Sequence, residues 1–354
     1  FMSFAIGSWG WTLRRRLQTS LTEETNMQPK VSVIVPIYKV EKFIKHCTET
    51  LFKQTMREVE YIFVNDATPD KSMEILNNVL IDFPERKPNV HILSHEKNKG
   101  LPTARNTGLA IAKGDYIFHC DSDDFVESSM LEDMYTKAVE KNADIVWSDW
   151  YLSYKNSERY MGQPNYETPL VALKSMLSGG MKFNVWNKLV KHRLYTDNNI
   201  SFPDEYGMGE DMTMIMLFSC ARKVAYIPKA YYHYVKLNAE AFSQTYSAKH
   251  LVELKYNVQR IADYIQAKYG CELEKELAFF KLETKFPFLI SDGSNGKYQL
   301  WKSWYPEANK YIMANKHVSL RSRTVQWLAW KGQWWLVRLY YQVVIKLIYS
   351  VFYR

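Results

Sequence analysis

The chain has 354 residues, 47% of them hydrophobic and 24% charged, with a formal net charge of +8. This composition excludes a disordered or low-complexity protein and is typical of one large globular domain or a domain with an appendage. The four cysteines lie far apart without a CxxC pair, which argues against a disulfide framework or a zinc site and favours a reducing cytosol.

Residues 1–29 precede the first predicted strand and form an N-terminal extension. Its apolar start is followed by three arginines, the reverse of the order in a signal peptide. The segment is either an upstream extension or a second surface-binding segment, and the sequence leaves both open.

From residue 30, short β-branched runs alternate with helical patterns. Strands are predicted at 31–38, 59–66, 89–95, 115–121 and 143–150, and helices at 41–54, 71–82, 102–112 and 128–141. Continuous apolar strands that alternate with helices predict an α/β fold, with a mostly parallel sheet covered by helices on both faces.

After residue 150 this alternation ends. The pattern predicts a polar loop at 155–168, helices at 170–178 and 211–221, a strand at 223–235 and helices over 246–320. We therefore divide the chain into the extension 1–29, an α/β domain 30–245 and a C-terminal helical region 246–354.

The end of the chain is basic and rich in tryptophan. Residues 301–354 hold nine Lys/Arg against one acid, and six of the eleven Trp. From Trp334 onward a polar residue recurs at every fourth position, so a helix here carries one narrow polar stripe. Two charges disfavour a bilayer span and favour an in-plane helix on an anionic membrane surface. Its predicted contacts are Trp334, Trp335, Arg338 and Lys346.

Two alternatives to a membrane surface exist for this basic end. A helix packed on the domain or on a second subunit is the alternative reading of its apolar surface. Nucleic acid is excluded as a partner, because no recognisable nucleic-acid-binding module accompanies the basic residues.

Polar side chains follow three of the predicted strands where each one ends. The first strand ends at Pro36 and Tyr38, the second at Asp66, and the fourth at Asp121 and Asp123. In an open parallel sheet, ligands bind beyond the carboxyl ends of the strands. We expect these side chains to share one binding crevice.

Asp121 and Asp123 lie two residues apart, and thus on the same side of an extended chain. This spacing suits a hard divalent cation that shares oxygen ligands with a phosphate. The sequence therefore predicts Mg²⁺ or Mn²⁺ with a bound diphosphate. A solvent-exposed acidic turn is the alternative, weakened by the apolar strand that leads to the crevice.

Two further segments carry candidate groups. In NKGLPTARNTG, Lys99 and Arg105 stand before and within a predicted helix, where cations suit a phosphate or a base. In the segment GED, Glu210 and Asp211 open a helix and suit either a helix cap or a general base.

These motifs match a known family. VSVIVPIYKVEKFI, FVNDATPD, NKGLPTARNTGL, DYIFHCDSDDF and GED, in this order over roughly 31–235, closely resemble family 2 of the inverting nucleotide-sugar glycosyltransferases. The resemblance implies a GT-A (Rossmann-like) fold and an enzyme of bacterial polysaccharide biosynthesis, such as capsule or cell-surface glycan. It does not cover the end of the chain from about 250.

The resemblance also implies roles in nucleotide binding. Pro36 and Tyr38 would line the base pocket with Glu41 close by. Asp66 would accept a hydrogen bond from the base, normally uracil, and Arg105 would reach the base or the diphosphate.

Further roles concern the metal, the chemistry and the sugar. Asp121 would hold the ribose or a metal-bound water, Asp123 would ligate the metal, and Asp211, with Glu210 beside it, resembles the catalytic base. His233 would touch metal or phosphate, although a core histidine is an equal alternative. The segment WNKL suggests acceptor or donor-sugar contacts from three neighbouring residues: Trp186, Asn187 and Lys188.

The reaction that the resemblance implies is a metal-dependent single displacement. A hexosyl or N-acetylhexosaminyl group would pass from a UDP-sugar to a hydroxyl of a glycan or lipid-linked acceptor. The QxxRW signature of processive relatives is absent, which favours transfer of one sugar per encounter. The predicted location is cytoplasmic, peripherally attached to the inner face of the cell membrane.

Two rival functions remain at this point. A sugar-1-phosphate nucleotidyltransferase has a similar sheet, but its Gly-rich start is missing after the first strand. A catalytically dead nucleotide- or glycan-binding scaffold is the other rival. The sequence does not identify the sugar, the acceptor or the linkage, and it leaves a homo-oligomer open.

Overall fold

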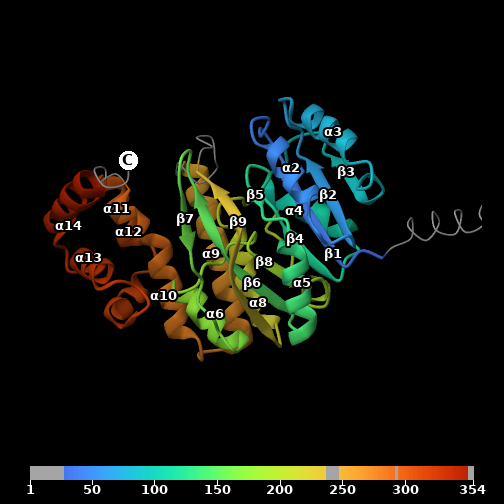
Figure 1. The fold of residues 1–354 in the computed structure, drawn as a ribbon. Coiled ribbons are helices and arrows are strands. Elements are labelled where there is room, and N and C mark those ends of the chain that lie inside the picture. Colours follow the sequence, from blue (N-terminus) through green and yellow to red (C-terminus); the bar gives the residue numbers. More distant parts are fainter. Residues whose placement is uncertain (1–27, 237–246, 292–293, 350–354) are drawn as a thin grey trace, which may run out of the picture.

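The protein folds around one sheet, seen in a computed structural model that describes residues 28–236, 247–291 and 294–349 (Figure 1). The described strands lie in the order β3-β2-β1-β4-β8-β6-β9-β5, with β7 paired to β6. Their bounds are β1 Val31–Ile37, β2 Val59–Asn65, β3 Val90–Ser94, β4 Tyr116–His119, β5 Phe125–Val126, β6 Ile145–Ser153, β7 Glu158–Met161, β8 Lys188–Lys191 and β9 Val224–Val235.

The first half of the sheet is parallel. β1 lies between β2 and β4 and runs parallel to both, and β3 extends the sheet beyond β2. β8 is inserted antiparallel between β4 and β6, and β9 runs parallel to β6. The predicted α/β fold, a curled and mostly parallel sheet with C-terminal helices, is confirmed.

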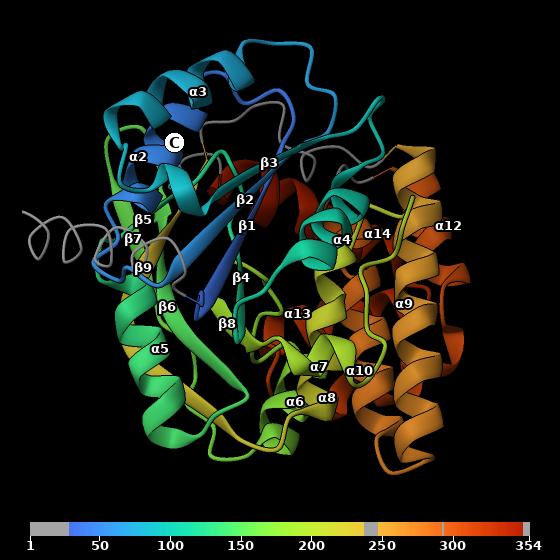
Figure 2. The same cartoon turned by 90° about the vertical axis from the view of Figure 1, so that its right-hand side faces the viewer.

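Helices cover both faces of this sheet, as predicted. In Figure 2, α2, α3 and α5 lie on one side of the strands and α4, α8 and α9 on the other. The helices of the first 220 residues are α2 Ile44–Phe52, α3 Ser72–Asp82, α4 Leu101–Ile111, α5 Met130–Lys141, α6 Pro169–Leu177, α7 Arg193–Thr196 and α8 Thr213–Cys220, with short 3-10 turns at η1 Lys87–Asn89 and η2 Glu210–Met212.

The polar loop predicted at 155–168 is wrong in part, because it contains strand β7. This strand forms a hairpin with the end of β6, in which Tyr151 pairs with Tyr160 and their rings meet edge to face at 5.6 Å. The sequence did not reveal this strand because its residues are mostly exposed and polar. An edge strand is held only by backbone pairing and cross-strand side-chain contacts with one neighbouring strand.

The C-terminal helices pack on the sheet domain through a shared core. They comprise α9 Ala248–Tyr269, α10 Glu274–Lys285, α11 Pro287–Ile290, α12 Asn295–Ser303, η4 Pro306–Ala314, α13 Leu320–Trp330, α14 Trp334–Tyr340 and the π-helix η5 Tyr341–Tyr349. Buried Val258, Ile261 and Trp301 belong to the same apolar cluster as Val33 and Leu217. The boundary predicted at 245 lies outside the described residues, and the core is continuous on either side of it.

Among the described helices, none is both long and apolar enough to cross a bilayer. The nearest candidate in the sequence, the helix predicted from Trp334 onward, is α14 continued by η5.

Helix α4 lies unusually close to β1 because of one glycine. A Cβ atom added to Gly108 would lie 2.5 Å from Cγ2 of Ile34, which is fully buried in β1. The missing side chain lets α4 sit directly on the sheet. The same helix carries Arg105, so this contact determines how deeply Arg105 reaches.

We expect Gly108→Ala to lower the free energy of unfolding by about 1–3 kcal/mol, since the added methyl group overpacks the α4–β1 contact. The matched control is Gly296→Ala in α12, where a Cβ meets nothing within 4 Å; its effect should stay below about 1 kcal/mol. Urea unfolding followed by circular dichroism measures both. Equal stability of the two variants would contradict the close seating of α4.

Candidate active site

The carboxyl ends of β1, β2 and β4 lie side by side, because these three strands are parallel neighbours. Tyr38, Asp66 and Asp121 follow these ends within the next two residues and thus belong to one rim. Tyr38 is 41% exposed, whereas Pro36 is buried within β1, so only the tyrosine presents a surface to a ligand.

Asp66 is buried and fully engaged with the chain itself. One carboxylate oxygen accepts from the backbone N–H of Lys99 at 2.7 Å and lies 2.7 Å from Nδ1 of His95. The other oxygen accepts from the N–H of Gly100 at 2.8 Å. Asp66 therefore fixes the turn that begins α4, where Gly100 takes a φ of 88°. Sequence reasoning missed His95, because it is the last residue of a predicted strand and carries no motif of its own.

Glu41 also bonds to its own neighbours on the loops beside the rim. Its Oε2 accepts from the backbone N–H of Lys71 at 3.2 Å, and its own N–H donates to Asp70 at 3.0 Å. It stays exposed, so its predicted place beside the base remains a prediction.

Arg105 is the centre of the site. Its side chain is 1% exposed, and its Nη2 donates to Oδ1 of Asp121 at 2.7 Å and lies 3.7 Å from Oε1 of Glu210. Its Nε and Nη1 are buried with no protein hydrogen-bond partner. The cation joins the end of β4 to η2, and it has donors left for a further acceptor.

Glu210 and Asp211 open η2 just after Gly209, whose φ of 90° favours glycine. Burial raises the pKa of Glu210 to about 8, with a further rise from Asp211 and an opposing effect from Arg105. Burial raises the pKa of Asp211 to about 6 against the opposing charges of Arg105 and Lys188. A carboxyl with a pKa near neutrality is suited to accept a proton.

Lys188 lies beneath this acidic pair and is fully buried. Its Nζ donates to the carbonyls of Lys182 and Asn184 and to Oδ1 of Asn187, at 3.0, 2.7 and 2.8 Å. Burial lowers its pKa to about 7, opposed by Asp211. It thus holds the loop before β8 rather than presenting a surface to a sugar.

Trp186 and Asn187 are also interior. Trp186 is 7% exposed and stacks on Tyr232 and Tyr234, with ring centroids 4.5 and 5.3 Å apart. Asn187 is buried and donates to the carbonyl of Ser148. Asn187 and Lys188 are thus bonded to the chain itself, and the sugar contacts predicted for the WNKL segment stay a prediction.

The three aspartates after β4 play different parts. Asp124 is buried, accepts from Oη of Tyr232 and the N–H of Val235, and burial together with Asp123 and Asp121 raises its pKa well above its usual range. Asp121 is held by Arg105. Asp123 is partly exposed and is the carboxylate best placed for a metal from outside.

The oxygen and nitrogen side chains near the rim show whether a divalent ion fits the candidate site. Within the described residues, no group of three or more His, Cys, Asp or Glu side chains forms a metal cluster. Mg²⁺ in particular is held by one or two carboxylates plus phosphate and water. Partly exposed Asp123 could supply one such carboxylate to an ion that arrives with a diphosphate, and its role as metal ligand stays a prediction.

His233, predicted to touch metal or phosphate, is in a different position. Its Nδ1 lies 2.7 Å from Glu158 and its Nε2 3.1 Å from Glu127, so both ring nitrogens are engaged. The ring also stacks between Phe125 and Tyr151. His233 thus joins β5, β7 and β9 through these contacts, and its predicted contact with metal or phosphate stays a prediction.

Tyr232 is a site residue that sequence reasoning missed. Its Oη accepts from the N–H of Asp121 at 3.0 Å and donates to Asp124 at 2.8 Å. It therefore ties the acidic loop to β9. The tyrosine-rich run 231–234 was visible in the sequence, but nothing in it marks which tyrosine points at the loop.

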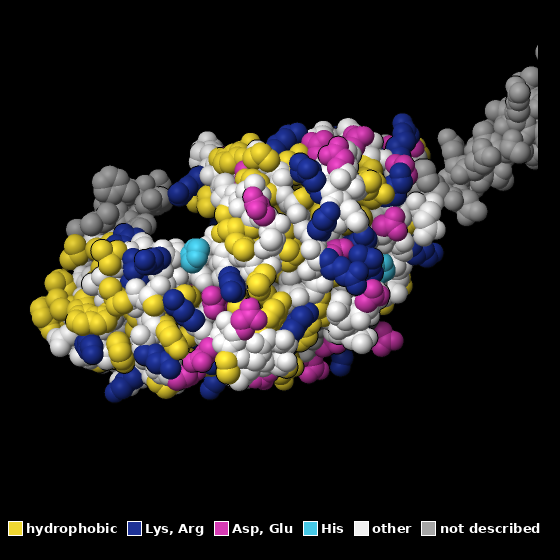
Figure 3. Space-filling view, turned by 90° about the horizontal axis from the view of Figure 1, so that it is seen from below, with side chains coloured by type: hydrophobic (Ala, Val, Ile, Leu, Met, Phe, Trp, Pro, Cys, Tyr) yellow, Lys and Arg dark blue, Asp and Glu magenta, His cyan; other side chains and the backbone are white. Residues whose placement is uncertain are grey.

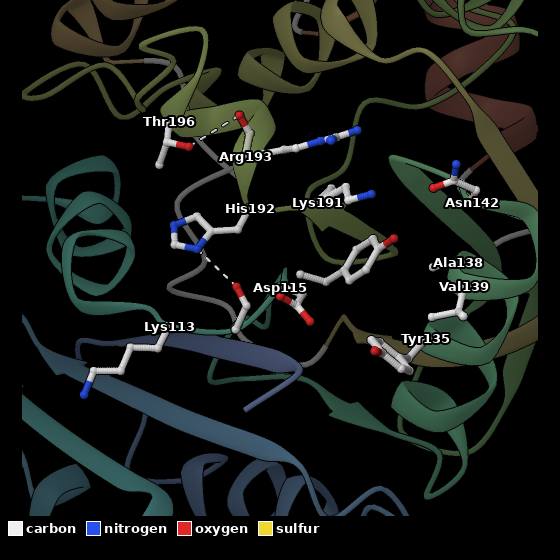
Figure 4. Close-up of a pocket in the computed structure, with 12 residues that line it drawn as sticks. Lys113, Asp115, Tyr135, Ala138, Val139, Asn142, Lys191, His192, Arg193 and Thr196 are labelled. Carbon is white, nitrogen blue, oxygen red and sulfur yellow. Dashed lines mark hydrogen bonds between the residues drawn. The ribbon is translucent and has the colours of Figure 1, made fainter. Parts of the chain in front are cut away.

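A separate hollow of about 540 Å³ lies beside the start of β4, at the opposite end of this strand from the rim (Figure 4). Lys113, Asp115, Lys191 and His192 line it near the start of β4, and His192 lies 3.1 Å from the carbonyl of Gly114. No predicted site residue lines this hollow, so it is not part of the candidate active site.

Comparison with known proteins identifies the family. The model of glycosyl transferase family 2 matches residues 32–204. The glycosyltransferase GlyG of Streptococcus pneumoniae is 31% identical over 221 residues, which are 59% of this chain and 71% of that protein. The chain belongs to glycosyl transferase family 2.

Two further relatives extend the family match. The cholesterol galactosyltransferase of Borreliella burgdorferi is 31% identical over 278 residues, 74% of either chain. The uncharacterized glycosyltransferase EpsJ of Bacillus subtilis is 33% identical over 217 residues, 59% of this chain and 61% of that protein. The chain thus covers less than two thirds of the length of EpsJ.

Solved structures show the same fold. S. aureus TarS 1–349 in complex with UDP-GlcNAc superposes with a TM-score of 0.62 at 22% identity, covering 88% of this chain and 90% of that one. The mannosyltransferase PcManGT of Pyrobaculum calidifontis, in complex with GDP-Man and Mn²⁺, gives a TM-score of 0.52 at 15% identity and covers 95% of both chains. The similarity in fold to these structures therefore also includes the C-terminal helices of this chain.

Proposed function

We propose that this family-2 chain transfers a hexosyl or N-acetylhexosaminyl group from a UDP-sugar to a hydroxyl of a glycan or lipid-linked acceptor, with inversion at C1. One observation carries the proposal: the buried guanidinium of Arg105 joins Asp121, on the rim where nucleotides bind, to Glu210, the neighbour of Asp211. Arg105 thus lies between the proposed nucleotide rim and the pair that contains the proposed base, Asp211.

The donor half of the reaction uses the rim. Tyr38 is exposed beside the ends of the strands, where an aromatic ring can stack on a base. Asp66 holds the loop that begins α4, and the unpaired N–H groups of Arg105 can donate to a ribose, diphosphate or sugar oxygen. These interactions would orient C1 of the sugar toward Asp211.

The metal belongs to the same half. Mg²⁺ or Mn²⁺ would be held by Asp123, with diphosphate oxygens and water as its other ligands. Bound there, the ion would supply positive charge to the departing diphosphate.

The acceptor half depends on Asp211. This carboxylate is partly exposed, so an acceptor hydroxyl can approach it, and its raised pKa suits proton abstraction. The acceptor oxygen would attack C1 while Asp211 takes its proton, and the bond from C1 to the diphosphate oxygen would break. The products are the inverted glycoside and UDP.

The relatives support the substrate classes. TarS was solved with UDP-GlcNAc and PcManGT with GDP-Man, so the shared fold accepts sugars on either nucleotide. The name of the Borreliella relative specifies galactose and a lipid acceptor. These proteins favour a nucleotide-sugar donor over the nucleotidyltransferase alternative, and they leave the sugar to experiment.

Nucleotide release tests the function. The wild type should release UDP from at least one of UDP-glucose, UDP-galactose and UDP-GlcNAc in the presence of glycan or lipid-linked acceptors, with GDP-mannose as the comparison donor. Asp211→Asn should lower the rate by about 10²–10⁴-fold, because the amide cannot take the proton. The control Asp197→Asn alters an exposed carboxylate after α7 and should match the wild type. Release from no donor would favour the scaffold alternative.

Metal removal tests the role of Asp123. Dialysis against EDTA should abolish turnover, and Mn²⁺ or Mg²⁺ should restore it, because the leaving diphosphate loses its counter-ion. Asp123→Asn should raise the Mn²⁺ concentration for half-maximal rate at least about tenfold. The control is Asp115→Asn, beside the start of β4 and away from the rim. It should leave this Mn²⁺ concentration unchanged. Full turnover after EDTA would contradict a metal-dependent reaction.

The pH dependence should follow Asp211. Since its pKa is raised to about 6 and only the carboxylate accepts a proton, kcat/KM should fall as pH drops below about 6. Lys188, with a pKa of about 7, is mostly charged below about pH 6, and its charge opposes the rise in the pKa of Asp211. Lys188→Gln keeps hydrogen-bond donors but removes the charge, so the acidic limb should shift to higher pH. An unshifted or downshifted limb would show that Asp211 does not sense Lys188.

A further inference from the structure

The C-terminal helices carry an exposed apolar face that the proposed reaction does not use. It is made by the outward sides of α13, α14 and η5, and we name it the aromatic face. Its members are all exposed: Leu320, Trp327, Trp330, Trp335, Leu339 and Val343. Figure 3 shows hydrophobic side chains gathered at this end of the molecule, with Lys and Arg side chains among them.

Helical periodicity explains why this face points outward. On α13, Val325 and Ala329 are buried, and Val337 is buried on α14. Trp335 and Leu339, four residues apart on α14, are 65% and 52% exposed. Both helices therefore already have a buried side, and the aromatic face is a second apolar surface without a partner in the described residues.

Within residues 301–354, the exposed charges beside the aromatic face are positive. Lys331, Arg338 and Lys346 are exposed, and Nζ of Lys331 lies 4.5 Å from the centre of the Trp330 ring. Glu307, the one acid in 301–354, lies 2.9 Å from Lys281 of α10. No carboxylate of 301–354 thus remains to neutralise the cations of this face.

Trp334, which the sequence predicts at the membrane, has aromatic partners within the helical region. Its ring stacks on Tyr298 at 5.4 Å and meets Trp301 edge-on at 6.2 Å. It links α14 to α12 and is partly buried against the core, and its predicted membrane contact stays a prediction. Trp327 and Trp330 of α13, which we had not assigned, take its place on the surface. The helix predicted from Trp334 onward is α14 continued by η5, and α13 adds a second helix to this surface.

We propose that the aromatic face docks this protein onto an anionic phospholipid surface. Exposed indole rings with Leu and Val suit the boundary between headgroups and acyl chains, and Lys and Arg beside them suit lipid phosphates. A second copy of the chain fits less well, because two faces of the same positive charge repel each other. The face would bring the active site to a lipid-linked acceptor.

The docking surface is separate from the catalytic proposal. It lies outside the matched residues 32–204 and contains none of the proposed site residues. Vesicle binding can therefore fail while nucleotide release persists, and the reverse can also occur.

Flotation of the full chain with vesicles tests the docking surface. The wild type should float with vesicles containing phosphatidylglycerol, less with phosphatidylcholine alone, and less again at high salt. Replacing Trp327, Trp330 and Trp335 together by Ala should weaken binding to the anionic vesicles by at least about tenfold. Lys331→Glu and Lys346→Glu should each weaken it by at least about fivefold and leave binding to neutral vesicles unchanged.

The control is Ile81→Ala in α3, which removes a side chain that is 75% exposed elsewhere on the surface; it should bind as the wild type does. Nucleotide release without vesicles shows that each variant is folded. Unchanged flotation of the triple Trp variant would overturn the proposal. A wild type that does not bind anionic vesicles would also overturn it. The same holds if the wild type sediments as a dimer and the triple Trp variant as a monomer.

Discussion

The ion pairs of buried Arg105 are the constraint on which the active site depends. A guanidinium that is 1% exposed needs negative partners, and it finds them on two segments far apart in the chain, Asp121 after β4 and Glu210 in η2. Without this cation, the carboxylates would repel each other and resist burial. Arg105 thus makes a crowded acidic site compatible with a closed fold, and its Nε and Nη1 keep donors without a protein partner.

The rest of the structure holds this cluster in place. Gly108 lets α4 lie on β1, so Arg105 reaches the rim. Tyr232 of β9 bonds to both ends of the acidic loop, and Lys188 of β8 holds the chain beneath Asp211. α9 packs beside η2, where Glu253 accepts from the N–H of Met208. Interior residues on four elements therefore position a few groups at the surface, as a preorganised site requires.

The sequence was informative where local pattern and function coincide. Alternating apolar runs predicted the α/β core, and the motifs around Asp66, Arg105, Asp121 and Asp211 predicted a family that the comparisons confirm. It was less informative where a residue's partner lies far along the chain. The pattern allows His233 to be a ligand or a core residue, and no local pattern predicts its contacts with Glu127 and Glu158. β7 and the outward turn of Trp327 likewise depend on neighbours that no local pattern specifies.

By itself, the sequence determined the chemistry available to this protein: which carboxylates follow which strands, where the cations stand, and that the last helices are basic and aromatic. Tertiary structure decided which of these groups act together. Asp124 is buried while Asp123 is partly exposed, although they are adjacent, and Trp334 packs inward beside an exposed Trp335. The physical reason is that burial and charge partners come from distant segments, so the role of each side chain follows from the packing around it.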